Sequence, residues 1–128
     1  MQLAASSATF EVPGYEPRPQ RTMRLILDLD HLRCFTAGSV EFEREILGLF
    51  AAELPKTLAA LEKAETPREW HIAAHTIKGS ALGVGACRLA EAARGAERAD
   101  ATGRALAIMR VKAAIAEVIA EAARLELI

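Results

Sequence analysis

The sequence predicts an all-α protein, and three observations support that prediction. Alanine, leucine and isoleucine are abundant, whereas aromatic residues make up only 5% of the 128 residues. Most of the chain lacks the alternation of apolar and polar residues that is typical of half-buried strands. Apolar residues instead recur at steps of three and four between helix start and stop signals. The length suits one domain with a core of its own.

The first 26 residues are predicted to be a flexible extension, and residues 27–128 a single helical domain. The extension holds a pair of serines and three prolines between residues 6 and 19, a mixture that disfavours regular structure. Just after it, Asp28 or Asp30 is placed to cap a brief helix. A positively charged start followed by an apolar segment is missing, so a secretion signal is not expected.

A long helix is predicted to begin after Ser39, whose side chain can accept a hydrogen bond from the first turn. Glu41 and Glu43 lie in that turn, where negative charge is favourable. Pro55 is expected to bend this helix but not to end it, because the apolar spacing continues beyond it. The predicted buried stripe consists of Phe42, Ile46, Leu49, Phe50, Leu54, Leu58 and Leu61.

The next helix is predicted to begin at Thr66 and Pro67. Threonine caps helices well, proline is accepted at the first helical position, and Glu69 is placed to close a capping box. Gly83 and Gly85 lower helix stability, so the helix is expected to end there. At about 100° per residue, its core face carries Trp70, Ala73, Ala74, Ile77, Ala81 and Val84.

Two more helices complete the predicted set. One runs from about residue 86 to residue 99, and its inward residues are Leu89, Ala92, Ala93 and Ala96. After a connection at residues 100–103, a long amphipathic helix carries the stripe Ile108, Val111, Ile115, Val118, Ala122 and Leu125. This stripe could form a coiled-coil dimer, but the other three helices need a fourth stripe to close their core. A closed four-helix bundle is therefore favoured.

The candidate nucleophile is His75, which lies opposite the core face of its helix. Its neighbours on the same outer face are Arg68, His71, Lys78, Gly79 and Leu82. An imidazole is neutral for part of the time near pH 7, so it can attack phosphorus without first losing a proton to a strong base. The outer face is also where a partner protein can reach the ring.

Lys78 and Gly79 are the other two candidate catalytic residues. Lys78 can place a mobile positive charge beside phosphoryl oxygens. Glycine inside a helix lowers helix stability by about 1 kcal/mol relative to alanine, so a glycine at position 79 calls for an explanation. Its missing side chain would let a partner approach His75. The candidate partner-binding residues are His71, Leu82, Arg68 and Arg88.

The run His-Thr-Ile-Lys-Gly-Ser-Ala at residues 75–81, with Gly85 ten residues after the histidine, resembles the signature of histidine-containing phosphotransfer (HPt) domains. That family includes the phosphotransfer domain of chemotaxis kinases, and the resemblance extends from near Leu27 to the C-terminus. It implies an antiparallel four-helix bundle with a short extra N-terminal helix. It also implies that Nε2 of His75 carries a phosphoryl group between aspartates of response-regulator receiver domains.

The resemblance further implies partners and cofactors. The expected partners are response-regulator receiver domains or a hybrid histidine kinase, and the receiver is expected to bring the Mg²⁺. No cofactor of the chain itself is expected. A Gly-rich phosphate loop is missing from the sequence, so phosphotransfer that uses ATP directly is not expected either.

Composition excludes several other classes of function. The formal net charge of −1 leaves no basic stripe for nucleic acid. No apolar run approaches the roughly 20 residues that span a bilayer. Cys34 and Cys87 are too few and too far apart for a disulfide framework or a metal cluster, and they fit a reducing cytosol. We therefore expect a cytoplasmic, monomeric, free-standing phosphate shuttle.

Three alternative functions stay open. A dimerisation and phosphoacceptor domain of a sensor kinase usually follows its histidine with an acidic residue and later a proline, whereas Thr76 follows His75 here and Pro67 is the last proline. A purely structural helical adaptor needs no glycine beside an exposed histidine. A metal-binding bundle is suggested by the i,i+4 spacing of His71 and His75. No further ligand stands at a suggestive spacing, so no metal site is expected.

Overall fold

The computed structural model describes residues 25–128, which contain five α-helices and one short 3-10 helix but no strand. The helices are α2 (Leu29–Thr36), α3 (Val40–Lys63), α4 (Pro67–Val84), α5 (Cys87–Arg98) and α6 (Arg104–Arg124), with η1 (Ala101–Gly103) before the last. The all-α prediction is confirmed. Of the predicted N-terminal extension, residues 1–24 lie outside the described residues, and Leu25 and Ile26 lead into the domain.

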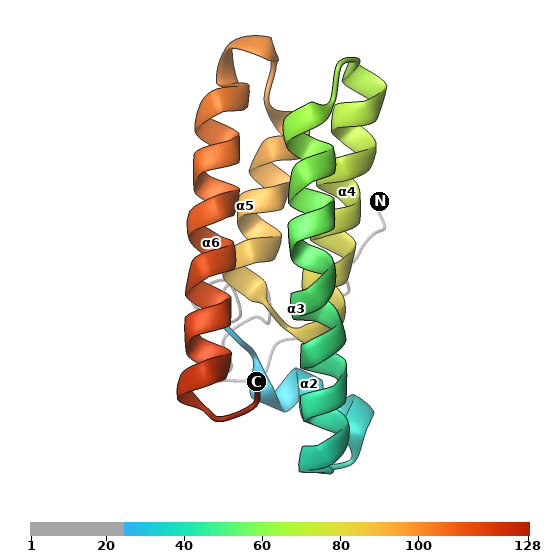
Figure 1. Ribbon diagram of the computed structural model, residues 1–128, viewed down its shortest axis with the longest axis vertical. Helices are drawn as coiled ribbons and strands as arrows, with labels where there is room; N and C mark the ends of the chain where they lie inside the picture. Colours follow the sequence, from blue (N-terminus) through green and yellow to red (C-terminus); the bar gives the residue numbers. More distant parts are fainter. Residues whose placement is uncertain (1–24) are drawn as a thin grey trace, which may run out of the picture.

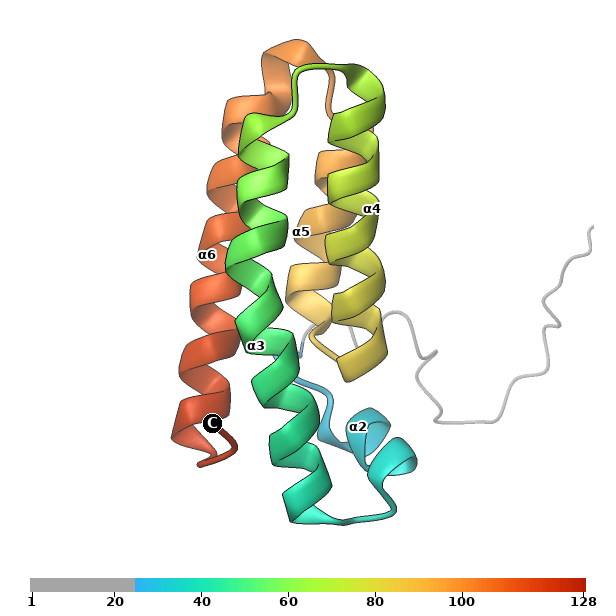
Figure 2. The same ribbon diagram turned by 45° about the vertical axis from the view of Figure 1, so that its right-hand side comes forward.

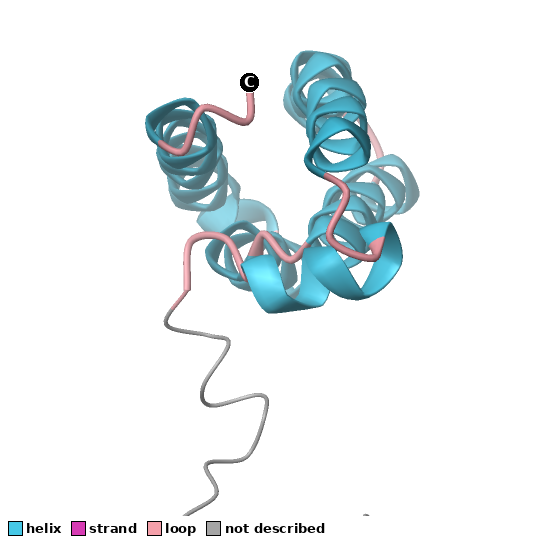
Figure 3. Ribbon diagram, turned by 90° about the horizontal axis from the view of Figure 1, so that it is seen from below, coloured by secondary structure: helices cyan, strands magenta, loops and turns pink. Residues whose placement is uncertain are grey.

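The four long helices form an up-and-down antiparallel bundle (Figures 1 and 2). Each of α3, α4 and α5 packs on the next helix in the chain, and α6 closes the bundle against α3. Seen along its length from the lower end, the helices stand around a common axis, with α2 at the near end (Figure 3). The predicted use of the last apolar stripe to close the bundle is therefore confirmed. None of the helices in residues 25–128 has the length and apolarity needed to cross a membrane.

The short helix α2 closes one end of the bundle. The side chain of Asp28 caps it by accepting a hydrogen bond from the backbone N–H of His31 at 3.2 Å. The backbone N–H of Asp28 donates to Gly85 O at 2.7 Å, and that of Arg88 donates to Leu25 O at 3.1 Å. The chain before α2 is thus hydrogen-bonded to the turn between α4 and α5.

The predicted buried stripe of α3 is wrong at its N-terminal end. Phe42 and Leu49 are 44% and 66% exposed, whereas Leu47 is 1% exposed and was not predicted. The cause is Glu43, a charged residue that lies on the core face next to α2 and interrupts the apolar pattern there. Its carboxylate is buried, where it accepts a hydrogen bond from Thr36 at 3.2 Å and lies 3.5 Å from Nε of Arg33. The buried residues of α3 are Glu43, Leu47, Phe50, Leu54 and Leu61, and Ile46 and Leu58 are partly buried.

The predicted starts of α3 and α4 are confirmed. The side chain of Ser39 accepts from the backbone N–H of Phe42, and that of Thr66 accepts from the N–H of Glu69. The Glu69 carboxylate reaches back to the N–H of Glu65 at 2.8 Å, one residue before the position that a standard capping box uses. The helix α3 runs through its internal proline without a break, as predicted.

The core face predicted for α4 is confirmed, since all six of its residues are buried. On α5, Leu89, Ala93 and Ala96 are buried as predicted, while Ala90 is buried in addition and Ala92 only partly. On α6, Val111, Val118 and Ala122 are buried, and Ile108, Ile115 and Leu125 are partly buried against the core. The small residues of α5 allow the close contact with α4 on which the site depends.

Candidate functional site

The outer face of α4 carries two histidines that are open to solvent. The side chains of His71 and His75 are 61% and 63% exposed, and they lie one helical turn apart. Their rings are stacked, with centroids 5.7 Å apart and planes inclined by 19°. The opposite face of the helix supplies the core, so packing places both side chains on the solvent side of α4.

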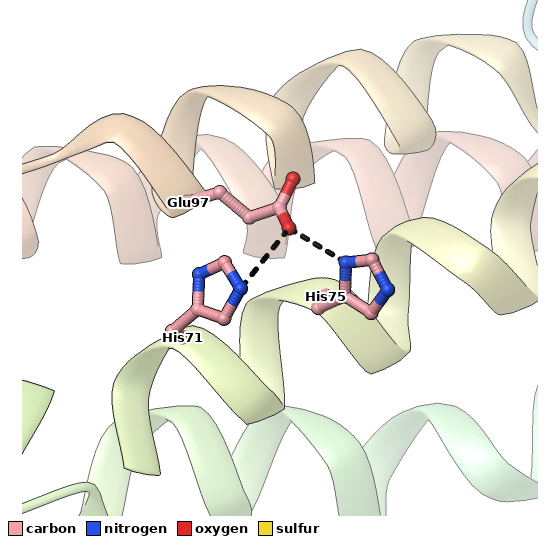
Figure 4. A group of neighbouring side chains, drawn as sticks. All are labelled: His71, His75 and Glu97. Atoms are coloured by element: carbon pink, nitrogen blue, oxygen red, sulfur yellow. Dashed lines mark hydrogen bonds and ion pairs between the residues drawn. The ribbon is translucent and has the colours of Figure 1, made fainter. Parts of the chain in front are cut away.

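The residue that organises this site is Glu97, near the end of α5 (Figure 4). Its Oε2 atom lies 2.8 Å from Nδ1 of His75 and 4.0 Å from Nε2 of His71. Its Oε1 atom accepts from the ammonium of Lys78 at 2.6 Å. The Glu97 side chain is only 10% exposed and that of Lys78 only 21%, so this ion pair between the two helices is largely shielded from solvent.

Packing between α4 and α5 sets the register that brings Glu97 to His75. The indole Nε1 of the buried Trp70 donates to Ala96 O at 2.7 Å, directly beside Glu97 in the chain. Further along, the left-handed Gly85 ends α4 and turns the chain into α5. These two contacts hold the helices at both ends of the segment that carries the site.

The carboxyl of Glu97 is held in its charged form. Partial burial by itself raises its pKa, but the hydrogen bonds and charges of Lys78 and His75 outweigh that effect and leave the pKa below its ordinary value. Glu97 is therefore a carboxylate near neutral pH, and a carboxylate can only accept hydrogen bonds.

The hydrogen bond to Glu97 favours one tautomer of the His75 ring. Since the carboxylate only accepts, Nδ1 of His75 donates, and in the neutral ring the lone pair then lies on Nε2. Figure 4 shows Nε2 directed away from Glu97, and no residue of the described region hydrogen-bonds to it. The arrangement presents an exposed, oriented ring nitrogen with its lone pair to solvent.

Comparison with known protein families matches residues 45–122 to the Hpt domain, and this span holds both His75 and Glu97. The chain belongs to the Hpt domain family. The resemblance noted in the sequence is thereby confirmed, and membership supports a phosphotransfer role in two-component signalling. Comparisons with curated proteins and with solved structures give no significant match.

Two further residues predicted for the site lie on the outer face of α4 of this Hpt domain. A side chain at Gly79 would meet no atom within 4 Å, so packing inside the described domain does not require glycine there. Leu82 is 47% exposed on the next turn. Both positions are open to a partner that approaches His75.

The two arginines predicted for the site lie in different places. Arg68 is exposed in the first turn of α4, on the same side as His75. Arg88 lies at the start of α5, nine residues before Glu97, which is about 13 Å along a helix axis. Its Nε atom pairs with Glu117 of α6 at 2.8 Å. The structure therefore does not bring Arg88 into the cluster around His75.

Glu97 was not among the residues predicted for the site. It lies 22 residues from His75 in the chain, so no helical spacing links the two. One signal was present: His75 is ten residues before Gly85, and Glu97 is eleven residues after Ala86. In two antiparallel helices joined by that tight turn, residues at similar distances from the turn lie near each other, and ten and eleven residues differ by only one.

Proposed function

We propose that this Hpt domain carries a phosphoryl group on Nε2 of His75 and exchanges it with aspartates of receiver domains, in response regulators or in a hybrid histidine kinase. The observation that supports this proposal best is the 2.8 Å hydrogen bond between Nδ1 of His75 and Glu97. It favours the tautomer whose Nε2 lone pair faces solvent.

The proposed transfer is a direct displacement at phosphorus. The Nε2 lone pair of His75 attacks the phosphorus of the receiver's aspartyl phosphate in line with the bond that breaks. The new bond is P–N, the broken bond is P–O, and the aspartate leaves as a carboxylate. Because the ring becomes positively charged as the bond forms, the Glu97 carboxylate at Nδ1 stabilises that charge. Mg²⁺ supplied by the receiver would neutralise charge on the phosphoryl oxygens.

Lys78 is proposed to act first as a positioning residue. Its ammonium holds Oε1 of Glu97, which leaves Oε2 for His75. Phosphoryl oxygens that arrive at His75 meet the same positive charge across one helical turn. The role proposed for Lys78 thus depends on its ion pair with Glu97. A lysine without that partner would act on the phosphoryl group only.

The proposed docking surface is the outer face of α4. Gly79 leaves the approach to the ring open, Leu82 supplies an apolar contact, and Arg68 and His71 lie further along the same face. One chain supplies the whole cluster of His75, Glu97 and Lys78, so a monomer suffices for the reaction.

The proposal is tested by incubating the protein with a panel of phosphorylated receiver domains and following acid-labile label. Label is expected on the wild type and not on His75→Gln. Label that persists on His75→Gln would move the acceptor elsewhere, with His71 the first position to replace. Absence of label with receivers that include the cognate partner would leave a helical adaptor as the better description.

A further inference from the structure

We propose that His71, His75 and Glu97 form a binding site for a divalent transition-metal ion such as Zn²⁺. The i,i+4 histidine pair alone supplies two ligands, and the sequence shows no third at a suggestive spacing. The fold supplies the third from α5, because Oε2 of Glu97 faces both rings (Figure 4). One ligand atom from each residue lies within 4.8 Å of the others.

The distances in the cluster suit a tetrahedral ion after small side-chain rotations. Ligand atoms about 2.1 Å from a tetrahedral Zn²⁺ lie roughly 3.4 Å from one another. Oε2 of Glu97 is 2.8 Å from Nδ1 of His75 and 4.0 Å from Nε2 of His71, on either side of that value. Both rings are more than half exposed, so their rotation is not opposed by packing. Solvent completes the fourth position.

The chemistry of the three ligands selects the class of ion. Two imidazoles and one carboxylate suit Zn²⁺, Cu²⁺ or Ni²⁺, whereas Mg²⁺ prefers oxygen ligands alone. Lys78 holds the other oxygen of Glu97 and so orients the carboxylate from outside the site. The positive charge of Lys78 also opposes a cation nearby, which lowers the affinity of the site without abolishing binding.

A metal ion in this site would prevent phosphorylation of His75, a consequence that rests on the function proposed above. The ion takes the lone pair of Nδ1, and the neutral ring then keeps its single proton on Nε2. The lone pair that attacks phosphorus is no longer available. Metal binding and phosphoryl transfer therefore compete for the same imidazole.

The binding test is calorimetric titration of Zn²⁺ into the full chain, without any receiver. One Zn²⁺ per chain is expected for the wild type. His71→Ala and Glu97→Gln should each weaken binding by about tenfold or more, because each removes one of three ligands. His31→Ala is the matched control, since His31 lies on α2 and is not part of the cluster, and it should bind as the wild type does. Circular dichroism checks that each variant keeps its helices.

The proposal is overturned if the wild type binds no Zn²⁺ at micromolar concentrations or if His71→Ala binds it as tightly. Equal affinity in Glu97→Gln and the wild type would also overturn it, because the site would then be only a surface histidine pair.

A second measurement separates this inference from the proposed function. Phosphoryl uptake from one receiver is followed with and without Zn²⁺, and each variant is compared with its own metal-free rate. Zn²⁺ should slow the wild type more than His71→Ala, whereas an effect of Zn²⁺ on the receiver would slow both equally and contradict the competition. If the chain binds Zn²⁺ but accepts no phosphate from its cognate receiver, the metal site stands and the proposed function fails.

Discussion

At the scale of single residues, the site depends on one carboxylate that serves three neighbours. Glu97 accepts hydrogen bonds from Lys78 through Oε1 and from His75 through Oε2. The Nε2 atom of His71 lies 4.0 Å from the same Oε2 atom. The first two contacts have different consequences: the lysine contact keeps the carboxylate charged and oriented, and the histidine contact selects the tautomer. Removal of Glu97 is therefore expected to affect His75 directly, although Glu97 lies on a different helix.

Glu97→Ala is expected to slow phosphoryl uptake by His75 about 10- to 100-fold, because the ring then loses the acceptor that holds Nδ1–H and stabilises positive charge. The measurement is the initial rate of acid-labile labelling from a phosphorylated receiver. Glu91→Ala is the control, since Glu91 also lies on α5 but pairs with Arg94. Equal rates for Glu97→Ala and the wild type would remove the role assigned to Glu97.

The lowered pKa of Glu97 predicts how its contribution to stability depends on pH. Burial alone would raise that pKa, but Lys78 and His75 hold it below the ordinary value of 4.5 in the folded protein. A group with a lowered folded-state pKa stabilises the fold above its unfolded-state pKa, and that contribution is lost as the pH falls through the folded-state value. Wild type should thus be more stable than Glu97→Gln at neutral pH, and the difference should shrink below pH 4.5.

Urea unfolding of both proteins at a series of pH values measures this difference. A difference in unfolding free energy that stays constant from neutral to acidic pH would show that the charge of Glu97 contributes nothing to folding.

At the scale of the helices, the two faces of α4 have different roles: one packs in the core of the domain, and the other is exposed to solvent. On its inner face, all six predicted core residues are buried. Its outer face keeps glycine at position 79, where a Cβ atom would meet nothing within 4 Å. The domain gains no packing from that glycine, and we expect its role to be access for a partner that approaches His75.

Gly79→Gln is expected to change stability and docking in opposite directions. Glutamine favours a helix over glycine by roughly 0.5–1 kcal/mol, so the unfolding free energy should rise, whereas receiver affinity and the transfer rate should fall because the side chain obstructs the approach to His75. Gly48→Gln is the matched control: Gly48 is also exposed within a helix, and a Cβ atom added there would meet nothing within 4 Å. It should stabilise the fold without affecting transfer. Unchanged transfer in Gly79→Gln would show that access is not the purpose of this glycine.

At the scale of the whole domain, the turn between α4 and α5 joins the bundle to the segment before α2. Gly85 has φ of 85°, and its carbonyl accepts from the N–H of Asp28 at 2.7 Å. A Cβ atom at Gly85 would lie 2.8 Å from the backbone oxygen of Asp28. The same turn sets where α5 begins, and hence where Glu97 lies along α4.

Gly85→Ala is therefore expected to destabilise the domain by about 2 kcal/mol or more, because it combines a left-handed backbone with a backbone clash. Urea unfolding measures the change. Gly103→Ala is the control, since Gly103 has no left-handed backbone and its nearest contacts would be at 3.6 Å, and it should change stability by less than about 0.5 kcal/mol. A similar small change at Gly85 would contradict the requirement for glycine.

Much of the fold follows from residues that are close together in the chain. Ser39 and Thr66 cap the helices that follow them, and Gly85 ends α4, because caps and left-handed turns are set by local backbone geometry. The helical repeat likewise sufficed to place His75 on the outer face of α4. The motif that begins at His75 was specific enough to indicate the Hpt domain family.

Other features depended on how the helices pack. Glu43 is buried against Thr36 and Arg33 of α2, Arg88 pairs with Glu117 of the neighbouring helix α6, and Glu97 reaches His75 from α5. These partners stand apart in the chain, and their meeting depends on the register between packed faces. The sequence by itself determined which residue is exposed as the candidate nucleophile. Only the tertiary structure decided which carboxylate orients it, because that contact joins two helices and no repeat within one helix encodes it.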